Sequence, residues 1–556
     1  MARFRQHQYL FAAIVATALA LIASDAQASG HGPTFDSVTD GSGGVIVVWE
    51  DSRYGERNIY AQRLDSLGAH QWPDTGVVIC AAPGHQYGPV AAPDGAGGAV
   101  IAWNDERGGN SDIYAQRVDG TGATLWATDG VPASTASGYQ NDPDIASDGS
   151  GGAIIVWNDF RVTGQVFAQR VSAAGVPSWQ EDGAAISPTG GRGAQIVSDA
   201  EGGGIVAWSD GDVFAQRVDP SGAALWNPSG VALCTTPGSF DEVPRIESDG
   251  WGGAFVSWYD VDHYRAYAQH VDPAGVIHWG STGAPVSTGS NYEFLPVPVS
   301  DGANGAIVTW ADRSLDYTME GLDAQRIGAD GAPQWGDGIA VAPVGTGQIN
   351  QSELTDGSGG ALVAFEDARS GYPQNIYAQR LTATGARAWG DDGLALCTAP
   401  RLQGRPVAVT DGADGAIVSW EDFRDFNYPN PGDSSIYAQR VRGSGATAWP
   451  SQGVRVYSMP RDLVSAGSSA SPFALEGVIP NPASGPFTVR FTLSAPGAAS
   501  VEILDLLGRK MAHRSAVLGA GAYEWRMDAE RRLAPGIYLV RLTQGGRRTV
   551  ARAPSG

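Results

Sequence analysis

The chain has 556 residues and a net charge of −23, with 76 glycines but also 17 tryptophans and 18 tyrosines. Such aromatic content excludes a disordered chain, and the length exceeds one simple core, so several domains or a repeat array are expected. From residue 473 onward there are 11 basic and 6 acidic side chains, so the part before it is strongly acidic. That acidity argues against nucleic acid as a partner.

The first 28 residues have the features of a signal peptide. Arg3 and Arg5 precede an apolar run from Leu10 to Ile22, and Ala26 and Ala28 suit a signal peptidase. The alternative is an uncleaved membrane anchor, but the run is short for a span of about 20 residues. We expect cleavage after Ala28, no later transmembrane segment, and a mature protein outside the cytoplasm.

A motif that begins as WEDSRYGERNIYAQRL at Trp49 recurs along most of the chain. Its copies begin at positions 49, 103, 157, 208, 258, 310, 365 and 420, a period of 50 to 55 residues. A fixed period with many shared positions denotes a repeat architecture.

Each repeat is predicted to form four short strands. In the second repeat these are GPVAAP, GGAVIAWND, DIYAQRVD and a segment ending in GVPAS, separated by Gly, Asp and Pro. Four-stranded units of this length predict an all-β fold, an eight-bladed β-propeller over residues 29–457, whose closure covers the apolar faces of the blades. The alternative is an open solenoid, but capping repeats are not recognisable. Both end repeats are complete, so no strand exchange is expected.

Polar residues at equivalent repeat positions are interpreted as structural, because a catalytic site needs one constellation and not eight copies. We expect them to bond backbone groups at the turns, with partly buried arginines paired to acids and tryptophans packed between blades. In the first three repeats they are Trp49, Asp51, Gln62, Trp103, Asp105, Gln116, Trp157, Asp159 and Gln169. Cys80, Cys234 and Cys397 also share one repeat position and are expected to be small buried residues without disulfides.

The loops between the second and third strands, and those between blades, vary among the repeats. Loops on a rigid scaffold carry function, so one face of the ring is predicted to bind a ligand. Aromatic side chains beside carboxylates suit a glycan or a protein, although drift in exposed loops is the alternative for each residue. The candidates are Tyr87, Tyr139, Asp142, Asp241, Asp262, His263, Tyr264, Tyr292, Glu293, Asp316 and Tyr317, with the insertion 425–434.

No catalytic residue, cofactor or metal site is predicted. The chain lacks H-E-x-x-H, C-x-x-C, G-x-S-x-G and P-loop motifs. The D-x-D pairs at 210/212 and 260/262 lack the remainder of a calcium loop. A pair of carboxylates for glycoside cleavage stays an open alternative, because the distance between the two acids is set by the fold and not by their separation in the sequence.

Residues 458–472 are predicted to be a linker and residues 473–556 a small Ig-like β-sandwich. The motif residues of this module are Pro480, Asn481, Pro482, Asp505, Gly508, Gly536 and Tyr538. They resemble the type IX secretion C-terminal sorting domain and the Ig-like (FlgD-like) domain of flagellar hook-capping proteins. The resemblance implies a secreted or surface protein that meets an export machinery. The repeats resemble YAQR-bearing repeats of exported bacterial proteins.

These patterns favour a secreted or cell-surface binding or adhesion protein that recognises a glycan or protein through the variable face. One alternative is a secreted carbohydrate-active enzyme, a hydrolase or lyase, that uses acids on the same face. Another is a structural component of the cell envelope.

Overall fold

The computed structural model describes residues 34–52, 56–161, 163–234, 241–289, 291–313, 319–342, 347–371, 373–424, 435–457, 474–479, 487–493, 497–504, 509–518, 521–527, 536–544 and 547–555. The predicted signal peptide and linker, the insertion 425–434, and the candidates Asp316 and Tyr317 lie outside these residues. So do Pro480, Asn481, Pro482, Asp505 and Gly508. The described secondary structure is entirely β, which confirms the predicted class. Nowhere in the described residues is a helix long and apolar enough to cross a membrane. The chain divides into two compact units, residues 1–458 and 459–556.

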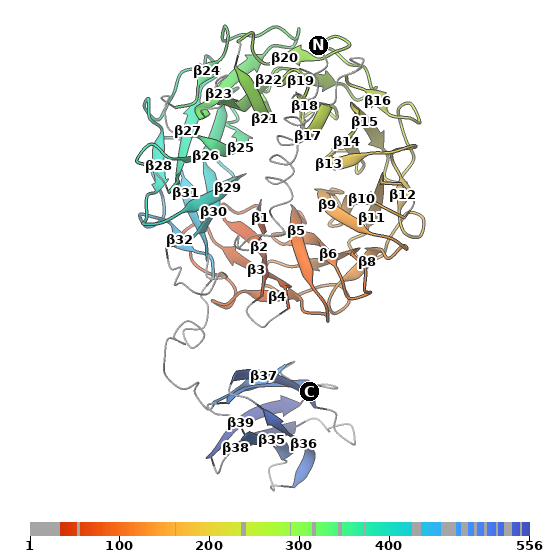
Figure 1. Cartoon of the computed structure of the whole chain (residues 1–556), viewed down its shortest axis with the longest axis vertical. Helices are drawn as coiled ribbons and strands as arrows, with labels where there is room; N and C mark the ends of the chain where they lie inside the picture. The colour runs from red at the N-terminus through yellow and green to blue at the C-terminus, as the bar shows by residue number, and fades with distance from the viewer. Residues whose placement is uncertain are drawn as a thin grey trace, which may run out of the picture. The chain divides into compact units, whose positions relative to one another are not determined.

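In the first unit each repeat forms one four-stranded antiparallel sheet, with its strands in chain order from the centre of a ring outward (Figure 1). The innermost strands are β1 (Phe35–Thr39), β5 (Gln86–Pro93), β9 (Gln140–Ser147), β13 (Arg192–Ser198), β17 (Asp241–Ser248), β21 (Tyr292–Ser300), β25 (Ile349–Thr355) and β29 (Gln403–Thr410). The second strands are β2 (Val45–Asp51), β6 (Ala99–Asp105), β10 (Ala153–Asp159), β14 (Gly204–Asp210), β18 (Ala254–Asp260), β22 (Ala306–Arg313), β26 (Ala361–Asp367) and β30 (Ala416–Asp422). The third strands are β3 (Asn58–Leu64), β7 (Asp112–Val118), β11 (Gln165–Val171), β15 (Asp212–Val218), β19 (Arg265–Val271), β23 (Met319–Ile327), β27 (Asn375–Leu381) and β31 (Ser435–Val441). The outermost strands are β4 (Val77–Cys80), β8 (Val131–Ser134), β12 (Ala184–Ala185), β16 (Val231–Ala232), β20 (Ala284–Pro285), β24 (Ile339–Ala340), β28 (Leu394–Cys397) and β32 (Val454–Arg455).

The turn between the first and second strands is built by an aspartate and glycines. In the second repeat Asp94 Oδ1 accepts hydrogen bonds from the backbone N–H groups of Ala96 and Gly98, each at 2.8 Å. Gly95 and Gly97 have φ of +74° and +88°, a conformation that glycine adopts without steric cost. The D-G-x-G-G pattern therefore fixes this hairpin locally.

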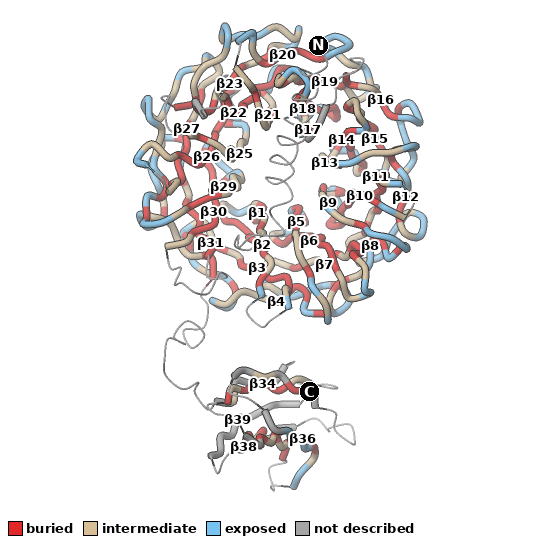
Figure 2. Tube along the Cα trace, in the orientation of Figure 1, coloured by how far each residue is buried: buried red, intermediate tan, exposed pale blue. Residues whose placement is uncertain are grey.

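The core lies between neighbouring sheets (Figure 2). Every residue of β6 is buried, so this strand is apolar along most of its length instead of alternating. Trp72 of the first repeat packs in one cluster with Ile101 and Trp103 of the second. Each sheet thus buries its apolar faces against its neighbours.

The last repeat contacts the first. The rings of Tyr457 and Trp49 stack with centroids 4.6 Å apart. Nη1 of Arg440 and Nε1 of Trp449 donate to the carbonyl oxygen of Ser66 at 3.0 and 3.1 Å. The eight sheets are consistent with an eight-bladed β-propeller.

The second unit contains two antiparallel sheets that share one core. One has the order β33 (Ala474–Ile479), β34 (Phe487–Leu493), β37 (Gly521–Met527), and the other β36 (Lys510–Leu518), β35 (Gly497–Leu504), β38 (Gly536–Gln544), β39 (Arg547–Ser555). Phe491 and Trp525 of the first sheet pack in a cluster with Val501 and Tyr538 of the second. The motif residues Gly536 and Tyr538 lie in β38.

Candidate functional site

The repeated Gln-Arg pair joins neighbouring repeats. Arg117 pairs with the buried carboxylate of Asp94 at 2.9 Å. Arg117 Nη1 and Trp126 Nε1 both donate to the carbonyl oxygen of Ala173 in the next repeat, at 3.4 and 3.0 Å. Gln116 Oε1 accepts the backbone N–H groups of both Arg117 and Trp126. We call this arginine the clasp arginine; in the other repeats it is Arg63, Arg170, Arg217, Arg326, Arg380 and Arg440.

A second recurring network lies at the end of the second strand in several repeats. Trp103 Nε1 donates to Asp105 Oδ2 at 2.8 Å, and Arg107 pairs with the same oxygen at 2.6 Å. The guanidinium lies 3.9 Å from the Tyr114 ring centroid and donates to Cys80 Sγ at 3.2 Å. Burial raises the pKa of that thiol to about 12. The same Trp–Asp bond joins Trp49 to Asp51, Trp157 to Asp159 and Trp420 to Asp422.

The fifth repeat departs from this network. His263 replaces the arginine, with its Nδ1 2.8 Å from Asp260 Oδ2 and its side chain 63% exposed. Tyr264 follows with φ of +57°, in the left-handed region that bulky side chains rarely adopt. The fourth residue after the buried aspartate is Gly109 in the second repeat and Gly371 in the seventh, also at positive φ. A strained tyrosine in place of glycine marks Tyr264, since such strain persists mainly at functional positions.

Tyr264 belongs to a group of rings from two repeats, Tyr259, Tyr264, Tyr292 and Phe294, which we call the aromatic cluster. The Tyr264 and Tyr292 centroids lie 4.5 Å apart, and those of Tyr259 and Phe294 lie 5.1 Å apart. Arg313 lies 5.4 Å from the Phe294 centroid. Tyr259 is buried and the other three rings are half-buried. Tilted packing of this kind is a preferred geometry of aromatic pairs.

Glu293 lies between two residues of the aromatic cluster but is buried. Its Oε1 is 2.7 Å from Arg265 Nη1 and also accepts the Ser287 hydroxyl. Its Oε2 accepts the Ala266 backbone N–H at 2.9 Å. Burial raises the pKa of this carboxyl, and the bonds counteract it. Glu293 therefore links the fifth and sixth repeats beneath the rings.

Tyr139 is the most exposed of the candidate aromatic residues that the structure describes. It is 63% exposed, beside Phe160, which is 46% exposed and donates its backbone N–H to Tyr139 O at 2.8 Å. Asp142 lies at a bulge of β9, with φ of +52°, and accepts the Asn158 side-chain amide at 3.0 Å. These residues are in the third repeat, apart from the aromatic cluster.

The other described candidates have local partners. Tyr87 donates to the Ser111 hydroxyl at 3.2 Å, and Arg57 lies 5.6 Å from its ring centroid. Asp241 pairs in register with Asp260 at the start of β17. Asp262 is exposed beside His263, with its backbone N–H on Asp260 Oδ1 at 2.9 Å. The structure thus brings Asp262, His263, Tyr264, Tyr292 and Glu293 to one place.

Sequence reasoning left Phe294, Arg265 and Phe160 out of the candidate set. Tyr292 and Phe294 are two residues apart in one strand, so the period of two places them on the same side. That alternation could have found Phe294. Phe160 and Arg265 come close to Tyr139 and Glu293 only through pairing between distant segments, which leaves no local signal.

The innermost strands carry acids with raised pKa values. Asp36 Oδ2 accepts the Ala91 backbone N–H at 2.9 Å, and Asp144 Oδ2 accepts that of Ile196 at 2.8 Å. Burial raises the pKa of each carboxyl to about 6. Because each acid bonds the next innermost strand, these carboxyls join repeats around the centre. Across the described residues, no group of three His, Cys, Asp or Glu side chains is arranged to hold a metal ion.

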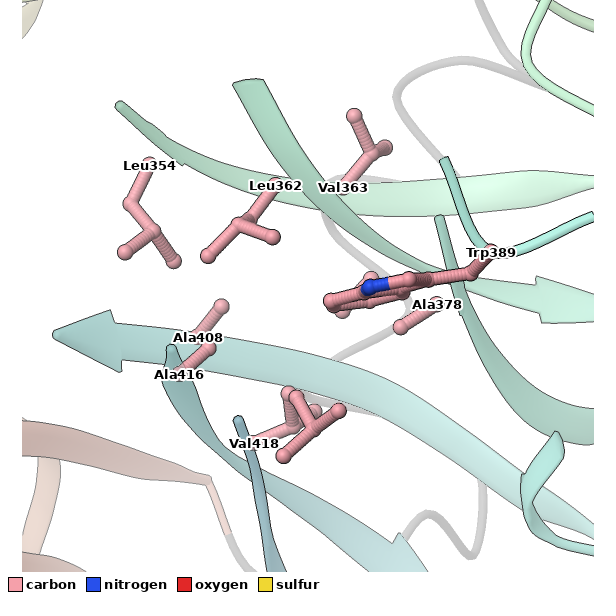
Figure 3. A pocket seen from close by; sticks show the side chains of 10 residues that line it. Leu354, Leu362, Val363, Ala378, Trp389, Ala408, Ala416 and Val418 are labelled. Carbon is pink, nitrogen blue, oxygen red and sulfur yellow. The ribbon is translucent and has the colours of Figure 1, made fainter. Parts of the chain in front are cut away.

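A small cavity lies between the seventh and eighth repeats (Figure 3). Its lining is almost wholly aliphatic, including Leu354, Leu362 and Val418. The indole N–H of Trp389, the polar group at its edge, donates to Gly443 O at 3.0 Å. With no polar group aimed inward, the cavity is a packing gap between sheets.

The C-terminal unit carries a recognisable family signature. Residues 477–553 match the family described as the secretion system C-terminal sorting domain. The match indicates a protein that is secreted, or attached to the outer surface, by type IX secretion. It also implies that the tail interacts with that export machinery. No curated protein sequence matches the chain.

Several solved structures are similar at low identity. A protein of unknown function from Dyadobacter fermentans is 12% identical with a TM-score of 0.37, covering 74% of this chain and 94% of that one. A PL25 ulvan lyase is 13% identical with a TM-score of 0.36, covering 82% and 96%. A puromycin-hydrolysing peptidase from Mycobacterium tuberculosis is 12% identical with a TM-score of 0.40, covering 73% and 57%. Likenesses at these scores assign no activity to the chain.

Proposed function

We propose that this secreted protein binds a glycan at the aromatic cluster, on one face of a closed eight-bladed propeller. The contacts of the last repeat with Ser66 support closure. Residues 1–28 act as the signal peptide, and the Ig-like module at 473–556 delivers the propeller to the surface or medium. Binding of a host or neighbouring-cell glycan would make it an adhesin.

The observation that carries this proposal is Tyr264, a strained tyrosine at the surface of the cluster. Aromatic faces bind the C–H faces of sugars, and nearby polar groups fix hydroxyl orientation. Asp262 and His263 supply such groups beside the rings, both exposed. Glu293 is held by Arg265 and Ser287, which disfavours a role for this acid in glycoside cleavage.

Glycan-array screening of the full chain tests the proposal, followed by calorimetry with each glycan that is retained. Tyr264→Ala and Tyr292→Ala should each weaken binding about tenfold or more, since a stacked ring and its burial contribute at least about 1.5 kcal/mol. Tyr139→Ala is the matched control, because it removes an exposed tyrosine from the same class of loop in another repeat.

Two outcomes would contradict the proposal. Equal loss in all three variants would show that the cluster has no special role. If new reducing ends appear on a glycan incubated with the protein, the protein cleaves that glycan by hydrolysis or elimination and is not only a binding protein. Circular dichroism melts of each variant distinguish lost binding from lost folding.

A further inference from the structure

The fifth repeat has lost the clasp arginine. His270 occupies its position, with Nε2 3.0 Å from the buried Asp249 Oδ2 and only 8% of its side chain exposed. An imidazole is too short to replace Nη1 of arginine across the joint. The carbonyl oxygen of Ala329 in the sixth repeat is bonded by Trp279 Nε1, at 3.4 Å. In the second repeat both a clasp arginine and a tryptophan bond the corresponding carbonyl.

A second histidine lies against the first. The His270 and His278 rings stack with centroids 5.0 Å apart, and His278 Nε2 lies 3.0 Å from Asp272 Oδ2. Each imidazole is thus nearer to its own carboxylate than to the other ring. Protonation of both creates two attractions at about 3 Å and one repulsion at about 5 Å, so attraction wins. The contact with His270 also lowers the pKa of Asp249, which keeps that carboxylate ionised.

His270 supports the residue that crosses the joint. Its ring packs between Phe255 and Trp279, at centroid distances of 4.7 and 6.1 Å. Asp249, its partner, also holds the turn at 249–253 through the backbone N–H of Gly253 and accepts Ser300 Oγ of the sixth repeat on its own carbonyl. A weaker His270–Asp249 contact therefore weakens two contacts with the sixth repeat, the one made by Trp279 and the one made by the turn at 249–253.

We propose that protonation of His270 sets how readily the joint between the fifth and sixth repeats opens. Histidine is the side chain whose charge changes between pH 5 and 8, whereas arginine stays charged. The protonated imidazole holds Asp249 by a charge-assisted bond, and the neutral imidazole holds it by a weaker one. At the other seven joints this position is held by an arginine, which keeps its charge throughout that range. This proposal does not depend on the ligand.

Hydrogen exchange of the full chain at pH 6 and 8, corrected for intrinsic exchange rates, tests it. Peptides of β19 and β21 should lose protection about fivefold at the higher pH, the difference between a charged and a neutral hydrogen bond. His270→Arg should reduce this pH dependence to the response of two carboxyls at the joint whose pKa is raised by burial, Glu247 and Glu293. Arg117→His should create it at the joint between the second and third repeats. Glu293 also titrates at this joint, but its response would persist in His270→Arg.

The proposal is overturned if wild type and His270→Arg show the same pH dependence at this joint. His278→Gln provides the second variant. It removes the exposed imidazole and keeps His270, so the pH dependence should remain. If His270→Arg fails to fold, Arg117→His still tests the proposal. The proposal is overturned if hydrogen exchange in Arg117→His shows no pH dependence at the joint between the second and third repeats.

Discussion

Arg440 of the last repeat donates from Nη1 to the carbonyl oxygen of Ser66 in the first, at 3.0 Å. The same guanidinium pairs with Asp411, whose carboxylate is 1% exposed. Arg440→Met should therefore lower the free energy of unfolding by about 3 kcal/mol, because it strands a buried carboxylate. Guanidinium titration monitored by tryptophan fluorescence measures the loss. Glu201→Gln removes an ion-pair partner that is 76% exposed and should cost less than about 1 kcal/mol; equal losses would argue against a role in closure.

Tyr264 allows a test of strain against function. Tyr264→Ala and Tyr264→Gly both remove the ring from its contact with Tyr292. They differ in backbone preference at φ of +57°, where glycine is favoured over other residues by about 1 kcal/mol. Tyr264→Gly should thus be the more stable variant by about that amount in thermal melts, and both should bind glycan equally weakly. If the alanine variant is the more stable of the two, the backbone at Tyr264 is not strained.

The Arg265–Glu293 pair can be tested with residues that the chain itself uses elsewhere. Corresponding positions hold Asn58 and Gln86 at the first joint, where Gln86 N donates to Arg57 O just as Glu293 N donates to Tyr264 O. Arg265→Asn should cost about 3 kcal/mol, because Glu293 then stays buried without its cation. Adding Glu293→Gln should recover part of that loss. A double-mutant cycle from denaturant titrations measures the coupling, and additive losses would contradict the pairing.

Asp144 predicts a pH effect of defined sign. Burial raises its pKa from 3.8 to about 6, so ionisation in the folded state costs free energy. The penalty is absent below about pH 4, grows between pH 4 and 6, and is complete above that range. Asp144→Asn should be more stable than wild type by up to about 2 kcal/mol at pH 7 and equal to it at pH 4. Denaturant titrations at both values check this; an equal difference at both pH values would mean that the carboxyl does not titrate in this range.

Local pattern was sufficient for the frame of the molecule. The period of the motif and the D-G-x-G-G turns predicted eight four-stranded sheets, because each hairpin is set by residues within a few positions of one another. The contact of Asp105 with Trp103 also follows from the sequence, because residues two apart in one strand point to the same side of the sheet. Glu293 shows the limit. In the sequence it resembles a loop acid beside Tyr292, and only the approach of Arg265 from the preceding repeat makes it a buried ion pair. Pairings between loops of different repeats carry no period, so the sequence leaves them undetermined.

The clasp arginines reach across seven of the eight joints to a backbone carbonyl, and the residues that supply it differ: Gly120, Pro220, Gly443 and Ser66 among them. Every residue type offers that oxygen, so a repeat can follow any other without a matched side chain in its new neighbour. Duplication or loss of a unit then preserves this contact, and a substitution at the residue that supplies the carbonyl needs no compensating change in the arginine. The face that carries Tyr264 and Tyr292 is in this way free to diversify, copy by copy, on joints that evolution does not have to rebuild.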